Sequence, residues 1–104
     1  MYRYQLLGIA RIMEGYKERE LTTDYLNRKQ KSFYGKARII TCNDGQYLQS
    51  YETIVARIDN SGNFARLWAG YSATTAKHID AFRRENGLAG ISKKDWDKLP
   101  VVDV

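Results

Sequence analysis

Over residues 2–16, apolar side chains recur every three or four positions, which is the spacing of one face of an α-helix. This pattern predicts an amphipathic helix, although its two glycines each weaken it by about 1 kcal/mol relative to alanine. The alternation over residues 2–6 would also suit a strand. Thr22 or Thr23 is the expected cap of a short second helix.

The middle of the chain changes to a period of two, which is typical of β-strands. Residues 36–42 are rich in β-branched side chains and lead into Asn-Asp-Gly, a strong signal for a hairpin turn. Residues 47–58 fit a second strand with a bend at residues 49–52. Polar turn residues follow at 59–63, and residues 64–68 alternate again. The sequence therefore predicts a three-stranded antiparallel meander.

A helix is expected after the third strand. Ser72 is the predicted N-cap, residues 73–86 carry an apolar stripe at helical spacing, and Gly87 ends the helix in the C′ position. A last helical turn within residues 92–99 is expected to dock Trp96.

These elements predict a small single α+β domain over residues 1–104. It comprises a variable, helical N-terminal part in residues 1–31, and a meander with a C-terminal helix packed on the sheet in residues 32–104. The hydrophobic fraction of 43% and the charged fraction of 28% are those of an ordinary globular chain. There is no long apolar run, no leader pattern, and only one cysteine, Cys42. We expect a cytoplasmic protein without a membrane span.

The excess positive charge is concentrated in one segment. The net charge is +5, and the stretch between Asp24 and Asp44 contains five cations and no acidic residue. These cations are Arg28, Lys29, Lys31, Lys36 and Arg38. A local patch of this kind attracts polyanions more strongly than the same charge scattered evenly.

Two aromatic residues, Phe33 and Tyr34, lie among these cations. Cations interleaved with rings suit a nucleic-acid strand, since lysines meet phosphates and rings stack on bases. An acidic protein face fits them almost as well. In an alternative interpretation the rings pack in the core and the cations form a solvated linker between helix and sheet. The predicted partner-binding site comprises Arg28, Lys29, Lys31, Phe33, Tyr34, Lys36 and Arg38, and Tyr47, Tyr51 and Tyr71 are further candidate contacts if they are exposed.

The sequence contains no recognisable catalytic or metal-binding constellation. Its one histidine, His78, flanks the apolar stripe of the predicted helix, and no nucleophile in the sequence pairs with it. Zinc-binding clusters of cysteine and histidine are missing, and the turn at Asp44 lacks the acidic series of a calcium loop. We therefore expect a structural or surface role for His78, no enzymatic activity, and no metal or cofactor.

Four stretches of the sequence carry a resemblance to a known family. They are residues 32–37 (Ser-Phe-Tyr-Gly-Lys-Ala), 48–51 (Leu-Gln-Ser-Tyr), 66–68 with 70–75, and 91–94 with Trp96. From Ser32 onward, about two thirds of its length, the chain resembles a small, largely uncharacterised domain family encoded by phages and conjugative elements of Gram-positive gut bacteria. These motifs carry no known chemistry, so the resemblance implies no catalytic residue.

The resemblance implies a protein of a mobile genetic element. Small proteins of such elements that lack an active site are often stoichiometric inhibitors of host defences, and anti-CRISPR proteins are the best-known kind. The expected function is thus a non-enzymatic inhibitor that binds a host defence nuclease or its guide complex, with RNA or DNA as further candidate partners. The alternative is a nucleic-acid-binding accessory protein for replication or transfer of the element.

Overall fold

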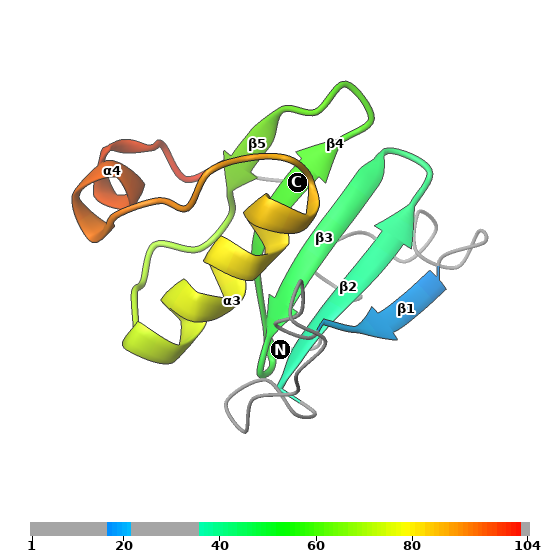
Figure 1. Ribbon diagram of the computed structural model, residues 1–104, viewed down its shortest axis with the longest axis horizontal. Coiled ribbons are helices and arrows are strands. Elements are labelled where there is room, and N and C mark those ends of the chain that lie inside the picture. The colour runs from blue at the N-terminus through cyan, green and yellow to red at the C-terminus, as the bar shows by residue number, and fades with distance from the viewer. Residues whose placement is uncertain (1–16, 22–35, 103–104) are drawn as a thin grey trace.

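Residues 17–21 and 36–102 are described by the computed structural model, and they form an antiparallel sheet followed by two helices (Figure 1). The strands are β1 (Lys17–Glu20), β2 (Ala37–Cys42), β3 (Gly45–Ser50), β4 (Thr53–Asp59) and β5 (Phe64–Arg66), and the helices are α3 (Ala73–Glu85) and α4 (Lys93–Lys98). The strands pair with one another in chain order. The predicted α+β class and the meander connectivity are confirmed.

β2 and β3 form the hairpin that the Asn-Asp-Gly turn predicts, with Cys42 paired to Gly45. Gly45 has a φ of +143°, and a Cβ at this position would collide with the carbonyl oxygen of Ile58 on β4. Glycine is therefore required here for both its conformation and its lack of a side chain.

Residues 47–58 belong to two strands, and the single bent strand expected from the sequence is wrong. β3 ends at Ser50, the chain reverses at Tyr51 and Glu52, and β4 starts at Thr53, which pairs with Ser50. From the sequence alone this reversal is predicted as a bend, because the two-residue turn contains neither the glycine nor the asparagine that usually marks a hairpin. This division adds one strand to the three that were predicted, and β1 makes the fifth strand of the described residues.

The prediction that residues 1–31 are helical is wrong for Lys17–Glu20, which form β1. All four of these residues are charged, so no apolar period marks them as a strand. β1 is placed by contacts with distant parts of the chain: it pairs with β2, and Arg19 forms an ion pair with Glu85 of α3. The helices expected over residues 2–16 and after Thr22 or Thr23 lie outside the described residues.

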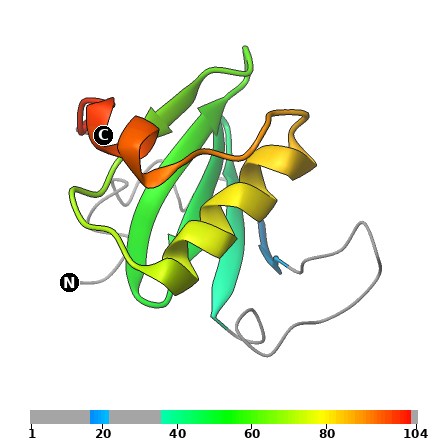
Figure 2. The same cartoon turned by 60° about the vertical axis from the view of Figure 1, so that its left-hand side comes forward.

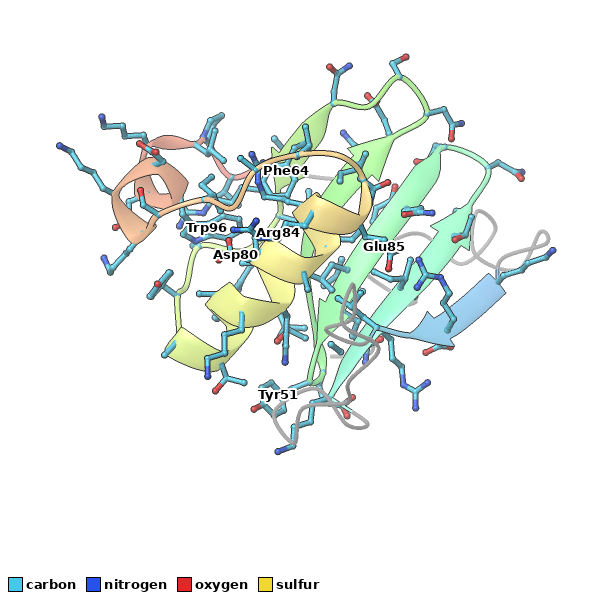
Figure 3. The ribbon with its side chains drawn as sticks, viewed as in Figure 1. Tyr51, Phe64, Asp80, Arg84, Glu85 and Trp96 are labelled. Carbon is cyan, nitrogen blue, oxygen red and sulfur yellow. The ribbon has the colours of Figure 1, made fainter. Side chains whose placement is uncertain are left out.

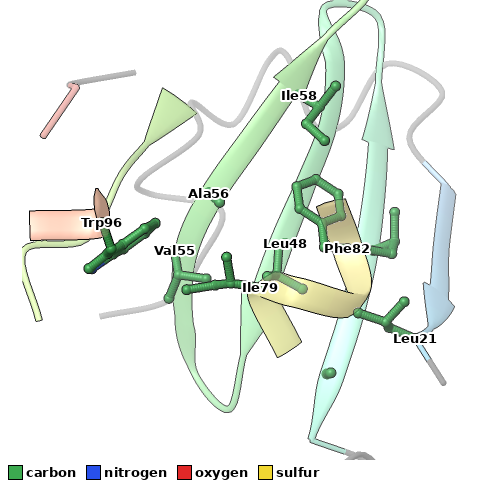
Figure 4. Packing of buried hydrophobic residues seen from close by; sticks show 10 residues of the cluster. Leu21, Leu48, Val55, Ala56, Ile58, Ile79, Phe82 and Trp96 are labelled. Atoms are coloured by element: carbon green, nitrogen blue, oxygen red, sulfur yellow. The ribbon is translucent and has the colours of Figure 1, made fainter. Parts of the chain in front are cut away.

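α3 covers one face of the sheet (Figure 2). The Ser72 hydroxyl accepts a hydrogen bond from the Thr75 N–H at 3.1 Å, and Gly87 follows the helix at a φ of +80°. Both predicted ends of the helix are confirmed. Ile79 and Phe82 point inward and are almost completely buried (Figure 4). The core on this face comprises Leu21, Ala37, Ile39, Leu48, Val55, Ala56, Ile58, Ile79, Phe82 and Trp96.

α4 is anchored by Trp96, which is 1% exposed, and the predicted helical turn around this residue is confirmed. The indole N–H donates to the carbonyl oxygen of Gly70 at 2.9 Å, and the guanidinium of Arg66 lies 4.9 Å from the ring centre. After α4, Val101 forms a parallel bridge with Arg66, so the chain returns to the edge of the sheet.

The other face of the sheet carries a second apolar cluster of Ile40, Cys42, Tyr47 and Ile54, all buried. Because side chains alternate along a strand, Ile40 and Tyr47 point away from the neighbouring pair Ile39 and Leu48 of the main core. In the described part of the chain, neither helix has the length and apolar character needed to span a membrane.

Candidate functional site

Only two residues of the predicted partner-binding site fall within the described ranges. Lys36 directly precedes β2 and is half-buried, and Arg38 lies on β2 with its side chain 41% exposed. The Arg38 Nε lies 3.8 Å from a carboxylate oxygen of Glu18, so part of its charge is balanced within the sheet. The remaining predicted residues, Arg28, Lys29, Lys31, Phe33 and Tyr34, lie outside the described residues.

Tyr51 contacts Lys36 and has an unusual backbone conformation. Tyr51 is 47% exposed, and its φ of 55° is the only positive φ of a non-glycine residue in the described ranges. This left-handed conformation costs an L-residue roughly 1–2 kcal/mol. The Tyr51 N–H donates to the carbonyl oxygen of Lys36 at 2.7 Å, and the Gln49 side-chain amide donates to the Tyr51 carbonyl oxygen at 2.6 Å. The turn is thus held in a strained conformation by hydrogen bonds on both sides of the tyrosine.

A buried polar cluster lies behind Tyr51. The hydroxyl of Ser50, at the end of β3, is 2.8 Å from the His78 Nδ1 and 2.8 Å from the Thr75 hydroxyl, both on α3. The ring centres of Tyr51 and His78 are 5.9 Å apart at an interplanar angle of 44°. The cluster therefore links the β3–β4 turn to the first turns of α3, and the exposed tyrosine rests on it. We call Tyr51, Lys36 and this cluster the Tyr51 corner.

A serine hydroxyl within hydrogen-bonding distance of an imidazole is the pairing of a nucleophile with a general base. Here Ser50 is 2% exposed and His78 is fully buried, so the hydroxyl is shielded from solvent and from a dissolved substrate. The hydroxyl is also shared with Thr75. Buried polar groups that satisfy one another in this way fix the relative position of the elements that carry them.

The three tyrosines proposed as candidate contacts are not equivalent. Tyr47 is buried on the second face of the sheet, and its hydroxyl donates to Asp44 at 2.7 Å, so it is not a surface contact. Tyr71 is 39% exposed, but the Lys93 ammonium of α4 lies 5.4 Å from its ring centre, so Tyr71 adjoins α4 and is not part of the candidate site. Figure 3 shows Tyr51 at the turn between β3 and β4, at the end of the sheet remote from Trp96 and Phe64. Tyr51 is thus the exposed ring that adjoins the basic segment.

The sequence indicated no partner for His78, and Ser50 is the residue that this reasoning missed. The register that pairs Ser50 with Ala37 turns the serine toward α3. A weak signal existed: Thr75, His78 and Phe82 share one helical face, which places two polar side chains within a buried stripe. Such buried polar side chains require a hydrogen-bonding partner on the sheet that the helix covers, but the sequence does not show which strand residue supplies it.

No three or more histidine, cysteine, aspartate or glutamate side chains are grouped to hold a metal ion within the described ranges. Comparison with curated proteins and with solved structures found no match to this chain. A family model, described as a family of unknown function (DUF8033), matches residues 22–98 and so begins ahead of Ser32, where the resemblance noted in the sequence starts. The match includes the whole Tyr51 corner and spans most of the chain, which therefore belongs to the DUF8033 family of unknown function.

Proposed function

We propose that the chain is a non-enzymatic binding protein whose contact surface comprises the Tyr51 corner and the basic segment of residues 28–38. One observation carries the proposal: the N–H of the exposed Tyr51 donates to the carbonyl oxygen of Lys36 at 2.7 Å. An exposed ring is thereby fixed to Lys36, one of the five cations of the segment that holds the excess positive charge. Cations beside an exposed ring suit a polyanionic partner.

The burial of Ser50 and His78 supports binding over catalysis. A substrate would have to reach a hydroxyl group on a residue that is 2% exposed, and the structure around it would have to open. Recognition through Tyr51 requires no such opening, because about half of that side chain is already at the surface.

The resemblance to a domain family of phages and conjugative elements supports a more specific role. In this proposal the chain is encoded by a mobile element and inhibits a host defence nuclease, in the manner of an anti-CRISPR protein, by stoichiometric binding to the nuclease or its guide complex. A net charge of +5 does not suit a mimic of DNA. The chain would instead contact RNA, DNA or an acidic face of the effector.

The proposal is tested by capture of the tagged chain from lysate of a host that contains CRISPR effectors, with the sample divided into nuclease-treated and untreated halves. Recovery of the same effector from both halves, followed by loss of that effector's DNA cleavage at equimolar chain, is the expected result. Recovery of nucleic acid alone, lost after nuclease treatment, would replace the inhibitor with an accessory protein of replication or transfer.

The contact surface is tested by charge reversal. The triple variant Lys29→Glu, Lys31→Glu and Lys36→Glu is expected to weaken the complex while the chain remains folded, because it removes the positive field at the proposed surface. The control variant Lys17→Glu, Lys94→Glu and Lys98→Glu changes the net charge equally at exposed lysines outside the basic segment. Equal binding by the two variants would exclude this segment from the interface.

A further inference from the structure

We propose that the ring of Tyr51 is a stacking platform for an unpaired base of single-stranded nucleic acid. This inference rests on the proposed function and assigns a ligand class to its central residue. Three features of the Tyr51 corner carry it: the backbone conformation of Tyr51, the support behind its ring, and its link to a cationic segment.

The first feature is the positive φ of an exposed aromatic residue. At a φ of 55° glycine would occupy the two-residue turn without strain, whereas the tyrosine keeps about half of its surface exposed. Residues held in such conformations concentrate at ligand-binding and catalytic sites, where the function of the side chain compensates for the strain. The turn thus retains a half-exposed ring at a position where the backbone conformation favours glycine.

The second feature is that the ring and its backbone are fixed before any ligand arrives. Hydrogen bonds hold the N–H and the carbonyl of Tyr51, and the ring lies 5.9 Å from that of the buried His78. His78 is itself held by the Ser50 hydroxyl at 2.8 Å. A ring that is already ordered loses less conformational entropy on stacking than a free surface tyrosine does.

The third feature is the backbone hydrogen bond that joins Tyr51 to Lys36, a member of the basic segment. Lys36, whose carbonyl accepts the Tyr51 N–H, is the fourth of five cations in a stretch without acidic residues. Proteins that bind single strands without sequence preference combine cations that contact the phosphates with aromatic rings on which the bases stack. Every base has an aromatic face, so this arrangement needs no base-specific hydrogen bonds.

The test uses a fluorescein-labelled oligothymidylate, the same strand with one internal 2-aminopurine, and a duplex of equal length. Tyr51→Phe keeps the ring and should retain affinity for the strand within about twofold. Tyr51→Leu keeps apolar bulk without a ring and should lose affinity by about 5- to 150-fold, together with the quenching of 2-aminopurine fluorescence. The duplex should bind more weakly than the strand, because its bases are already stacked.

Tyr71→Leu is the matched control. Tyr71 is also an exposed tyrosine with a lysine near its ring, but it lies outside the Tyr51 corner and has no positive φ. Its replacement should leave affinity for the strand within about twofold of wild type.

Tyr51→Gly separates ligand binding from folding. Glycine relieves the positive φ but removes the half-buried ring, and these two effects oppose each other, so the Tm should stay within about 5 °C of wild type while the strand binds as weakly as it does to Tyr51→Leu. If it instead lowers the Tm by roughly 10 °C, the ring is a requirement of the fold and the inference is overturned.

The inference and the proposed function fail in different ways. If the wild type binds the strand and Tyr51→Leu retains that affinity, stacking is overturned while a polyanion-binding function stands. If the wild type does not bind the strand but captures and inhibits a nuclease without nucleic acid, stacking is again overturned and the ring belongs to a protein interface. If the chain neither binds the strand nor captures a partner, both proposals are overturned.

Discussion

At the scale of single residues, Arg66 joins two segments of the described structure that lie far apart in the sequence. It is 6% exposed, and its guanidinium donates to four carbonyl oxygens: Trp68 at 2.8 Å, Ala69 at 2.6 Å, Trp96 at 3.0 Å and Leu99 at 3.2 Å. These carbonyls belong to the segment after β5 and to the end of α4. One planar group thus positions both segments, and a lysine ammonium does not have this geometry.

Arg66→Lys is therefore expected to lower the free energy of unfolding by about 2–3 kcal/mol, because carbonyl groups around a nearly buried site lose their donors. In a domain of this size the change lowers the Tm by roughly 10–20 °C. Urea titration with tryptophan fluorescence measures it. Arg84→Lys replaces an exposed arginine and should change stability by no more than about 0.5 kcal/mol. Similar losses in the two variants would show that the four hydrogen bonds do not stabilise the fold.

At the scale of elements, the hydroxyl of Ser50 connects β3 to α3. Ser50→Ala leaves the Thr75 hydroxyl and the His78 Nδ1 without this hydrogen bond in a buried site, so we expect a loss of about 1–3 kcal/mol in unfolding free energy. Thr75→Val should lower the free energy of unfolding less in the Ser50→Ala variant than in the wild type, and the coupling energy between the two sites should be about 0.5–1.5 kcal/mol. Urea denaturation of the four proteins in this cycle gives the coupling, and Ser61→Ala in an exposed turn is the neutral control.

The elements also differ in how far the sequence predicts them. β2 and α3 were found because their signals are local: β-branched residues before an Asn-Asp-Gly turn, and an apolar stripe between Ser72 and Gly87. β1 was missed because Lys17–Glu20 are charged throughout and become a strand through pairing with β2 and an ion pair to Glu85. The reversal at Tyr51 has no local signal, because its two-residue turn lacks glycine and asparagine and the Tyr51 N–H donates to the carbonyl oxygen of Lys36, far away in the sequence.

The candidate site, like the elements, has one part with a local sequence signal and one part that depends on long-range contacts. The charged segment is visible in the sequence because charge is counted along the chain. The Tyr51 corner is not, because Ser50, Thr75 and His78 meet only after the sheet and α3 have packed. Tyr51 appeared in the sequence as one of three tyrosines of unknown exposure, and only its position in the fold distinguishes it from the buried Tyr47.

At the scale of the whole molecule, the uneven distribution of charge predicts how binding depends on salt. If all five cations of residues 28–38 contact phosphates of a single strand, a plot of log K against log salt should have a slope of about −3.5, since each contact contributes about 0.7. The Arg38 Nε lies 3.8 Å from a carboxylate oxygen of Glu18. If Arg38 keeps that ion pair, four cations contact phosphates and the slope becomes about −2.8.

Fluorescence anisotropy of the labelled oligothymidylate at several salt concentrations measures this slope. The triple variant Lys29→Glu, Lys31→Glu and Lys36→Glu should flatten it, because fewer counterions are released when fewer phosphates are neutralised. Lys17→Glu, Lys94→Glu and Lys98→Glu alter the net charge to the same extent, yet should keep the wild-type slope, since these lysines lie outside the segment. If both variants flatten the slope alike, the net charge of the molecule attracts the strand and the segment is no specific contact. A wild-type slope near zero would show that the cations do not contact phosphates, and binding would then depend on uncharged contacts such as stacking on the ring of Tyr51.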